Sequence, residues 1–211
     1  MTPLRICLPL GALFEGSVAA LAKAGVDVAV LGDVGRRLVV TAEDGTTFIT
    51  TRPTDVPIYV ESGAADVGVV GSDVLREQRP MVYELLDLGF GACRMIYATL
   101  AGEDPTRSAL DHLGAVRVAT KYPNVAVAHF ASTGRQAEIV KVHGSVELGP
   151  LVGLSHGIVD LTATGTTLQA NGLVEREELF VASARLIANR VSHKTSAEVI
   201  DALVERMDVA Q

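Results

Sequence analysis

Residues 157–173, GIVDLTATGTTLQANGL, combine the residue types of a phosphate-binding turn. The pattern predicts a strand that ends at Asp160, a compact turn, and a helix that begins near Thr167. Backbone N–H groups in the first turn of a helix have no partner within the helix and lie at the positive end of its dipole, so they attract phosphate. Gly165 allows a ligand to approach closely. Uncharged hydroxyl donors come from Thr162, Thr164, Thr166 and Thr167.

Asp160 indicates which molecule would carry that phosphate. A carboxylate at the strand end, just before the turn, is placed to accept hydrogen bonds from sugar hydroxyls. The acid, the spacer and Thr-Gly-x-Thr together therefore indicate a phosphoribosyl group. An ordinary capped turn beside a solvated carboxylate is the alternative, and a lone Thr-Gly-Thr would favour it. The strand, the acid and the helix in sequence favour the phosphate site.

The elements around this turn alternate between strand and helix patterns, which predicts the α/β class with mixed sheets. Expected strands occupy residues 5–10, 36–41, 46–51, 65–71, 116–121, 138–144, 157–162 and 180–190. Expected helices occupy residues 13–25, 54–63, 124–132 and 166–173, a short one from Ser72, and a last one capped by Ser192 or Thr195. The strands at 36–41 and 46–51 flank Asp44-Gly45, a pair typical of hairpin turns.

Two domains are expected. Apolar stretches at 83–91 and 92–102 follow one another closely, as where a chain crosses between domains, and the run at 180–190 leads back. We expect a first domain of residues 1–88 plus 182–211, and a second domain of residues 89–181 that carries the phosphate turn.

Composition excludes several classes of protein. The chain has 211 residues, 48% hydrophobic and 20% charged, which excludes disordered and collagen-like proteins. A net charge of -7 disfavours nucleic acid as a partner. Cys7 and Cys93 lie in apolar runs, which predicts buried thiols in a reducing compartment. No apolar run is long enough for a membrane span or an uninterrupted signal peptide, so we expect a cytoplasmic protein.

Eight segments together resemble the short form of ATP phosphoribosyltransferase, the first enzyme of histidine biosynthesis, over essentially the whole chain. They are RICLPLGALFE, GRRLVV, RPTDVPIYVESGAADVGVVGSDVL, LLDLGFGACR, RVATKYPN, VKVHGSVELGPLVGL, IVDLTATGTTLQANGL and SARLIAN. The resemblance implies a fold like the type II periplasmic binding proteins, with two α/β domains and a central cleft. It implies that N1 of ATP displaces pyrophosphate from C1 of 5-phosphoribosyl diphosphate (PRPP), with Mg²⁺ bound through the substrate phosphates. It also implies a homodimer and a regulatory subunit resembling histidyl-tRNA synthetase in a hetero-oligomer.

The resemblance also implies roles for particular residues. Arg36 and Arg52 would be catalytic and reach the polyphosphates. PRPP would be bound by Asp160, Thr162, Thr164, Gly165, Thr166 and Thr167, and ATP by Gly71, Asp73, Gly91 and Cys93. No side chain is expected to be a dedicated metal ligand.

The chain departs from the family pattern at its first loop. Leu10 and Ala12 stand where the family has lysine and arginine, and His156 stands where an aspartate is common. A leucine cannot replace a cation that faces a polyphosphate, so either Arg36, Arg37 or Arg52 compensates, or a partner contributes the charge, or the activity is weak. The alternative function is therefore a non-catalytic binding protein of the same fold for a phosphorylated or anionic small molecule.

Overall fold

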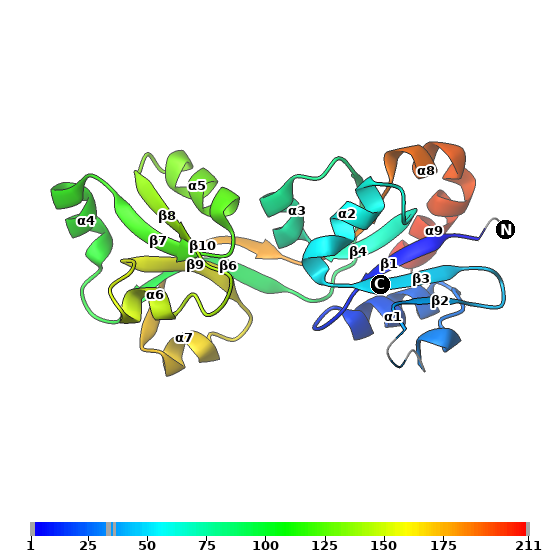
Figure 1. The fold of residues 1–211 in the computed structure, drawn as a ribbon, viewed down its shortest axis with the longest axis horizontal. Coiled ribbons are helices and arrows are strands. Elements are labelled where there is room, and N and C mark those ends of the chain that lie inside the picture. Colours follow the sequence, from blue (N-terminus) through cyan, green and yellow to red (C-terminus); the bar gives the residue numbers. More distant parts are fainter. Residues whose placement is uncertain (1–2, 33–34, 36, 210–211) are drawn as a thin grey trace. The chain divides into compact units, whose positions relative to one another are not determined.

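The chain forms two α/β units in a computed structural model that describes residues 3–32, 35 and 37–209 (Figure 1). The first unit comprises Met1–Gly91 and Ser183–Gln211, and the second comprises Ala92–Ala182. The sequence placed the first crossing near residue 88. Leu88 packs in the core of the first unit and the Phe90 carbonyl accepts a hydrogen bond from the Ala184 N–H at 3.0 Å, so this stretch stays with the first unit as far as Gly91.

The first unit is built on one mixed sheet. In the described residues its strand order is β2-β3-β1-β4-β11-β5. The strands are β1 (Arg5–Pro9), β2 (Val39–Thr41), β3 (Thr47–Thr51), β4 (Val67–Gly71), β5 (Tyr83–Asp87) and β11 (Ala184–Ala188). β1 runs parallel to β3 and β4, so the carboxyl ends of these three strands share one edge. β2 pairs antiparallel with β3, which confirms the expected hairpin.

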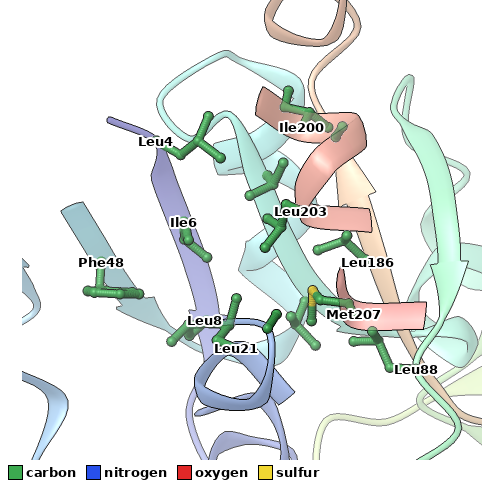
Figure 2. Close-up of a cluster of buried hydrophobic side chains, with 14 of the residues drawn as sticks. Leu4, Ile6, Leu8, Leu21, Phe48, Leu88, Leu186, Ile200, Leu203 and Met207 are labelled. Carbon is green, nitrogen blue, oxygen red and sulfur yellow. The ribbon is translucent and has the colours of Figure 1, made fainter. Parts of the chain in front are cut away.

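Helices cover both faces of this sheet because its central strands alternate their side chains between two cores. Ile6 and Leu8 join Leu21 and Leu203 in a cluster drawn in Figure 2, and Cys7 points to the other face. The first face is covered by α1 (Phe14–Lys23) and α9 (Ala197–Val209), and the second by α2 (Val56–Glu61) and α3 (Ser72–Gln78). Short 3-10 turns at Ala29–Leu31 (η1) and Pro53–Asp55 (η2) and the helix α8 (Arg190–Thr195) complete the described part of the unit.

The second unit is built on a sheet of strand order β10-β6-β9-β7-β8. The strands are β6 (Cys93–Leu100), β7 (Val116–Thr120), β8 (Ala137–Lys141), β9 (Gly157–Thr162) and β10 (Leu173–Ala182). β7 runs parallel to β8 and β9, whereas β6 is antiparallel to β9 and β10. β7 and β9 therefore end at the same edge of the sheet.

Two separate cores again bury the two faces of that sheet. Tyr97 and Val159 pack with Phe130, beneath α4 (Pro105–Leu113) and α5 (Pro123–Ser132). Ile158 packs with Leu168 on the opposite face, with α6 (Leu148–Leu151) and α7 (Thr166–Ala170). Figure 1 shows these two helix pairs on opposite sides of the sheet.

The elements not expected from the sequence include α4, α6, η1 and β10, of which α4 and β10 are the longest. α4 begins after Asp104, whose carboxylate accepts the Thr106 N–H at 2.9 Å as an N-cap. β10 has the charged sequence LVEREELFVA, and cross-strand ion pairs from Arg94 to Glu175 at 2.6 Å and to Glu178 at 3.3 Å link it to β6. Opposite charges on adjacent strands stabilise their pairing, which the local sequence does not reveal.

Several local expectations were wrong. The C-terminal region forms two helices rather than one, and Asn189 caps the first, α8, through the N–H groups of Val191 and Ser192, both at 2.9 Å. The last helix, α9, begins at Ala197, and the hydroxyls of the two residues expected to cap it instead donate to the Asp66 carboxylate (Ser192) and to carbonyls of α8 (Thr195). The helix at 13–25 was expected to bury a stripe that includes Leu21 and Ala22, but Ala22 is exposed, and Ser17 and Leu21 form the buried side of α1. Cys93, the first residue of β6, is only half-buried, whereas Cys7 is fully buried. Among the described residues, no helix has the length and apolar content needed to cross a membrane.

Candidate active site

The turn between β9 and α7 brings the threonines of the phosphate motif together. The Thr162 hydroxyl accepts the Gly165 N–H at 2.9 Å, and the hydroxyls of Thr164 and Thr166 lie 2.8 Å apart. Gly165 has a φ of +76°, a left-handed conformation that a glycine adopts without steric cost. The first amide to reach a carbonyl of the preceding turn is that of Gln169, which donates to Gly165 at 3.0 Å. In that first turn the Thr166 N–H lies 3.5 Å from the Thr164 hydroxyl, and the amides of Thr167 and Leu168 have no carbonyl of a preceding helical turn to donate to.

A pocket of about 210 Å³ lies at this turn, and its lining includes Asp160, Glu147 and the residues from Thr162 to Thr167. A Cβ added to Gly165 would meet no heavy atom within 4 Å, so the glycine borders open space. The hydroxyls and amides of the turn are therefore accessible to a small anionic group.

Asp160 lies on the same face of the sheet as α7. It follows Ile158 at the two-residue period of a strand, and Ile158 packs against Leu168 of that helix. Only 13% of the Asp160 side chain is exposed. Burial raises the pKa of its carboxyl above the usual value, Lys121 opposes that rise, and Glu147 adds to it.

Lys121 is a site residue that sequence reasoning missed. Its ammonium lies 3.4 Å from Asp160 Oδ2. The sequence allows Lys121 to line the cleft, but a lysine at a strand end is usually solvated, so it was not among the expected site residues. The signal lies in the register, because Thr120 pairs with Val159, so the next residues along each strand are neighbours.

Arg52 lies at the carboxyl edge of the sheet in the first unit. It follows β3 directly and its side chain is exposed. The Leu10 N–H donates to the Thr51 carbonyl at 2.7 Å, which brings the loop after β1 beside Arg52. Ligands of open α/β sheets bind at the carboxyl ends of strands, so this edge is a suitable place for a polyphosphate. Arg36 lies outside the described residues.

Three of the expected ATP-binding residues lie in the first unit. Gly71 ends β4, and a Cβ there would collide with the carboxylate of buried Asp73. Gly91 has a φ of +67°, and its Cα is covered by Leu13 from the loop after β1. Ala184 connects the two positions, because it pairs with Gly71 and donates its N–H to Phe90. Cys93 begins β6 in the second unit.

The histidines show no metal centre. Across the described residues, no group of three or more His, Cys, Asp and Glu side chains could hold a metal ion. His129 instead lies 2.9 Å from Glu177, which also pairs with Arg135. His156 accepts the Arg117 N–H at 2.9 Å, at the start of β9. The departure from the family pattern at His156 is therefore at the opposite end of that strand from the phosphate turn.

The two sheets and the helices on their faces define a class of fold, that of the periplasmic binding proteins. The aliphatic sulphonate binding protein SsuA of Escherichia coli has this fold, with a TM-score of 0.60 at 11% identity over 99% of this chain and 72% of SsuA. At that identity the similarity concerns the fold alone.

Sequence comparison gives the family. The family model for ATP phosphoribosyltransferase matches residues 52–209. An ATP phosphoribosyltransferase of Rubrobacter xylanophilus is 54% identical over 92% of this chain and 90% of its own, and one of Symbiobacterium thermophilum is 48% identical over 98% and 94%. The chain belongs to the ATP phosphoribosyltransferase family. A solved structure, the ATP phosphoribosyl transferase (HisG:HisZ) complex from Thermotoga maritima, matches with a TM-score of 0.82 at 33% identity over 98% of both chains.

Proposed function

We propose that this protein transfers the 5-phosphoribosyl group of PRPP to N1 of ATP with release of pyrophosphate, the first step of histidine biosynthesis. Family membership supports the reaction, and the observation that carries the proposal is the pocket between Asp160 and the turn from Thr162 to Thr167. Its donors are uncharged amides and hydroxyls that suit a sugar phosphate, and Asp160 lies beside them as an acceptor for ribose hydroxyls.

The chemistry needs alignment more than proton transfer. Adenine N1 already has a lone pair, and displacement at an anomeric carbon passes through a state with positive charge on the sugar. Holding the ribose at a fixed point relative to N1 therefore lowers the barrier. Stabilising the departing pyrophosphate lowers it further. We assign the first role to Asp160 and the turn, and the second to Arg36 and Arg52.

The remaining site assignments are part of the same proposal. Gly71, Asp73 and Gly91 would contact ATP, together with Cys93. Their support is a shared location, since the first three lie in one unit, where Ala184 pairs with Gly71 and donates its N–H to Phe90, the residue before Gly91.

A magnesium ion would be bound mainly through the substrates. Mg²⁺ commonly keeps several waters and takes substrate phosphates as ligands, so it needs no dedicated cluster of side chains. When bound it would neutralise charge on the pyrophosphate.

We further propose a cytoplasmic protein that forms a homodimer and assembles with a regulatory subunit resembling histidyl-tRNA synthetase. The solved ATP phosphoribosyl transferase (HisG:HisZ) complex from Thermotoga maritima supports a hetero-oligomer. The proposal of a homodimer rests on the family resemblance. The proposal of a cytoplasmic location rests on the resemblance and on the two thiols, of which Cys7 is buried.

The absence of cations at Leu10 and Ala12 favours the second candidate function, a binding protein that does not catalyse a reaction of its ligand. Leu10 is 42% exposed at the edge that carries Arg52, so no cation occupies that position. The two functions are separated by incubating the purified chain with ATP, PRPP and Mg²⁺, with and without a regulatory subunit from a relative. We expect phosphoribosyl-ATP and pyrophosphate. PRPP binding without product under both conditions would favour the binding protein.

A further inference from the structure

The charges around the phosphate pocket pose a problem for an anionic ligand. Asp160 and Glu147 both line the pocket, and PRPP would add a phosphate to it. Like charges at close range repel strongly where water is partly excluded. Lys121 lies at 3.4 Å from Asp160 and supplies the opposite charge.

The main chain around Lys121 is fixed by buried hydrogen bonds. The Thr120 hydroxyl, fully buried, donates to the Val159 carbonyl at 2.6 Å and accepts the Tyr122 N–H at 2.8 Å. Pro123 then begins α5. The backbone on both sides of Lys121 is thus held against β9, so its side chain starts from a fixed point beside Asp160.

From this geometry we infer that Lys121 is a positioning residue: its ammonium keeps the Asp160 carboxylate ionised and oriented into the pocket, where it accepts hydrogen bonds from the ribose of PRPP. The inference rests on the function proposed above. Lys121 need not touch the sugar, and it acts through Asp160.

The other groups that face Asp160 do not replace this charge. Glu147, next to α6, is an acid and disfavours ionisation of a second acid nearby. Ile96, the partner of Asp160 on β6, is apolar and fully buried. The Leu161 amide supports the carboxylate, but α7 contributes only uncharged groups to the pocket. The burial that raises the pKa of Asp160 is therefore opposed mainly by Lys121.

The test compares Lys121→Met, which keeps the length of the side chain and removes its charge, with Lys121→Arg, which keeps the charge. Lys141→Met is the matched control. Lys141 is an exposed lysine on β8, opposite Thr120, so this substitution removes the same charge one strand further from Asp160. The first readout is the titration of the Asp160 carboxyl carbon by NMR in each variant. The second is kcat/KM for PRPP from pH 5 to pH 9.

We expect Lys121→Met to move the Asp160 titration upward by about one pH unit, which corresponds to roughly a tenfold change in the ionisation equilibrium. The acidic limb of the kcat/KM profile should move in the same direction. The Michaelis constant should rise for PRPP more than for ATP, with kcat less affected. Lys121→Arg should restore most of the loss, and Lys141→Met should resemble the wild type.

An unchanged Asp160 titration in Lys121→Met, or an equal shift in Lys141→Met, would overturn the inference. A titration shift without a change in the pH profile for PRPP would overturn it too. If the wild type makes no phosphoribosyl-ATP, the proposed function fails, and the NMR titration still tests the pairing of Lys121 with Asp160 separately.

Discussion

Replacing Gly165 by alanine distinguishes two roles of this glycine: it adopts a left-handed backbone conformation, and it leaves space for the ligand. Gly165 has a φ of +76°, where an L-residue with a side chain costs about 1 kcal/mol. A Cβ there would meet no protein atom within 4 Å, so no clash adds to that cost. For a chain of this size, such a loss lowers the Tm by roughly 2–4 °C.

The same methyl group would stand in the space where we place the sugar phosphate. Charge-assisted hydrogen bonds from the turn contribute about 1.5–3 kcal/mol each, and displacing the phosphate by a methyl radius would weaken at least one of them. We therefore expect the KM for PRPP to rise about tenfold or more, since ~1.4 kcal/mol is a factor of ten. The KM for ATP should change little.

Gly134→Ala is the matched control for Gly165→Ala. Gly134 follows α5 in the same unit, has a φ of +69°, and also has no heavy atom within 4 Å of an added Cβ. Thermal unfolding and steady-state kinetics are measured for both variants. Both should lose similar stability, and only Gly165→Ala should lose affinity for PRPP. Equal kinetic effects, or none in Gly165→Ala, would refute the placement of the phosphate.

Three further predictions concern the site, the buried thiol of Cys7 and the ion pair of Asp66. Asp160→Ala and Thr164→Val should each weaken PRPP more than ATP in steady-state kinetics, because both lie at the pocket at the end of β9; equal losses for the two substrates would contradict the assignment. Burial raises the pKa of Cys7 from 9.0 to about 12, so the thiol ionises in the unfolded chain first. The free energy of unfolding should therefore fall as the pH rises from 9.0 towards 12. Denaturant titrations of Cys7→Ala should show a weaker decline, and an identical decline would refute ionisation of Cys7 as its cause. Burial tends to raise the pKa of Asp66, but hydrogen bonds from Arg5 and Ser192 outweigh burial and lower it. Asp66→Asn should therefore reduce the free energy of unfolding by about 1 kcal/mol at pH 7, and this difference should shrink as the pH falls below 3.8. A difference that does not depend on pH would exclude ionisation of Asp66 as its source.

Local sequence patterns predicted the elements that form through local rules. The hairpin of β2 and β3 follows from Asp44-Gly45, where Gly45 adopts a φ of +89° and Asp44 accepts the Thr46 N–H at 2.8 Å. The order of β9, turn and α7 follows from apolar residues, a glycine and hydroxyls in succession. These features need no information from distant parts of the chain.

Features that depend on distant residues could not be predicted in this way. β10 pairs with β6 from Leu173 to Ala182, and Arg94 of β6 forms ion pairs with Glu175 and Glu178, whereas by itself the charged segment has no strand pattern. The ion pair of Lys121 and Asp160 depends on the parallel register of β7 and β9. The ligand roles of the site residues stay predictions.

The central claim is that the turn from Thr162 to Thr167 binds the 5-phosphate of PRPP. The most direct measurement is a crystal structure of the protein with PRPP and Mg²⁺ bound. We predict the phosphate within hydrogen-bond distance of the turn's amides and threonine hydroxyls, with the ribose hydroxyls on Asp160. A phosphate found at another place, with the pocket at the turn empty, would contradict the account.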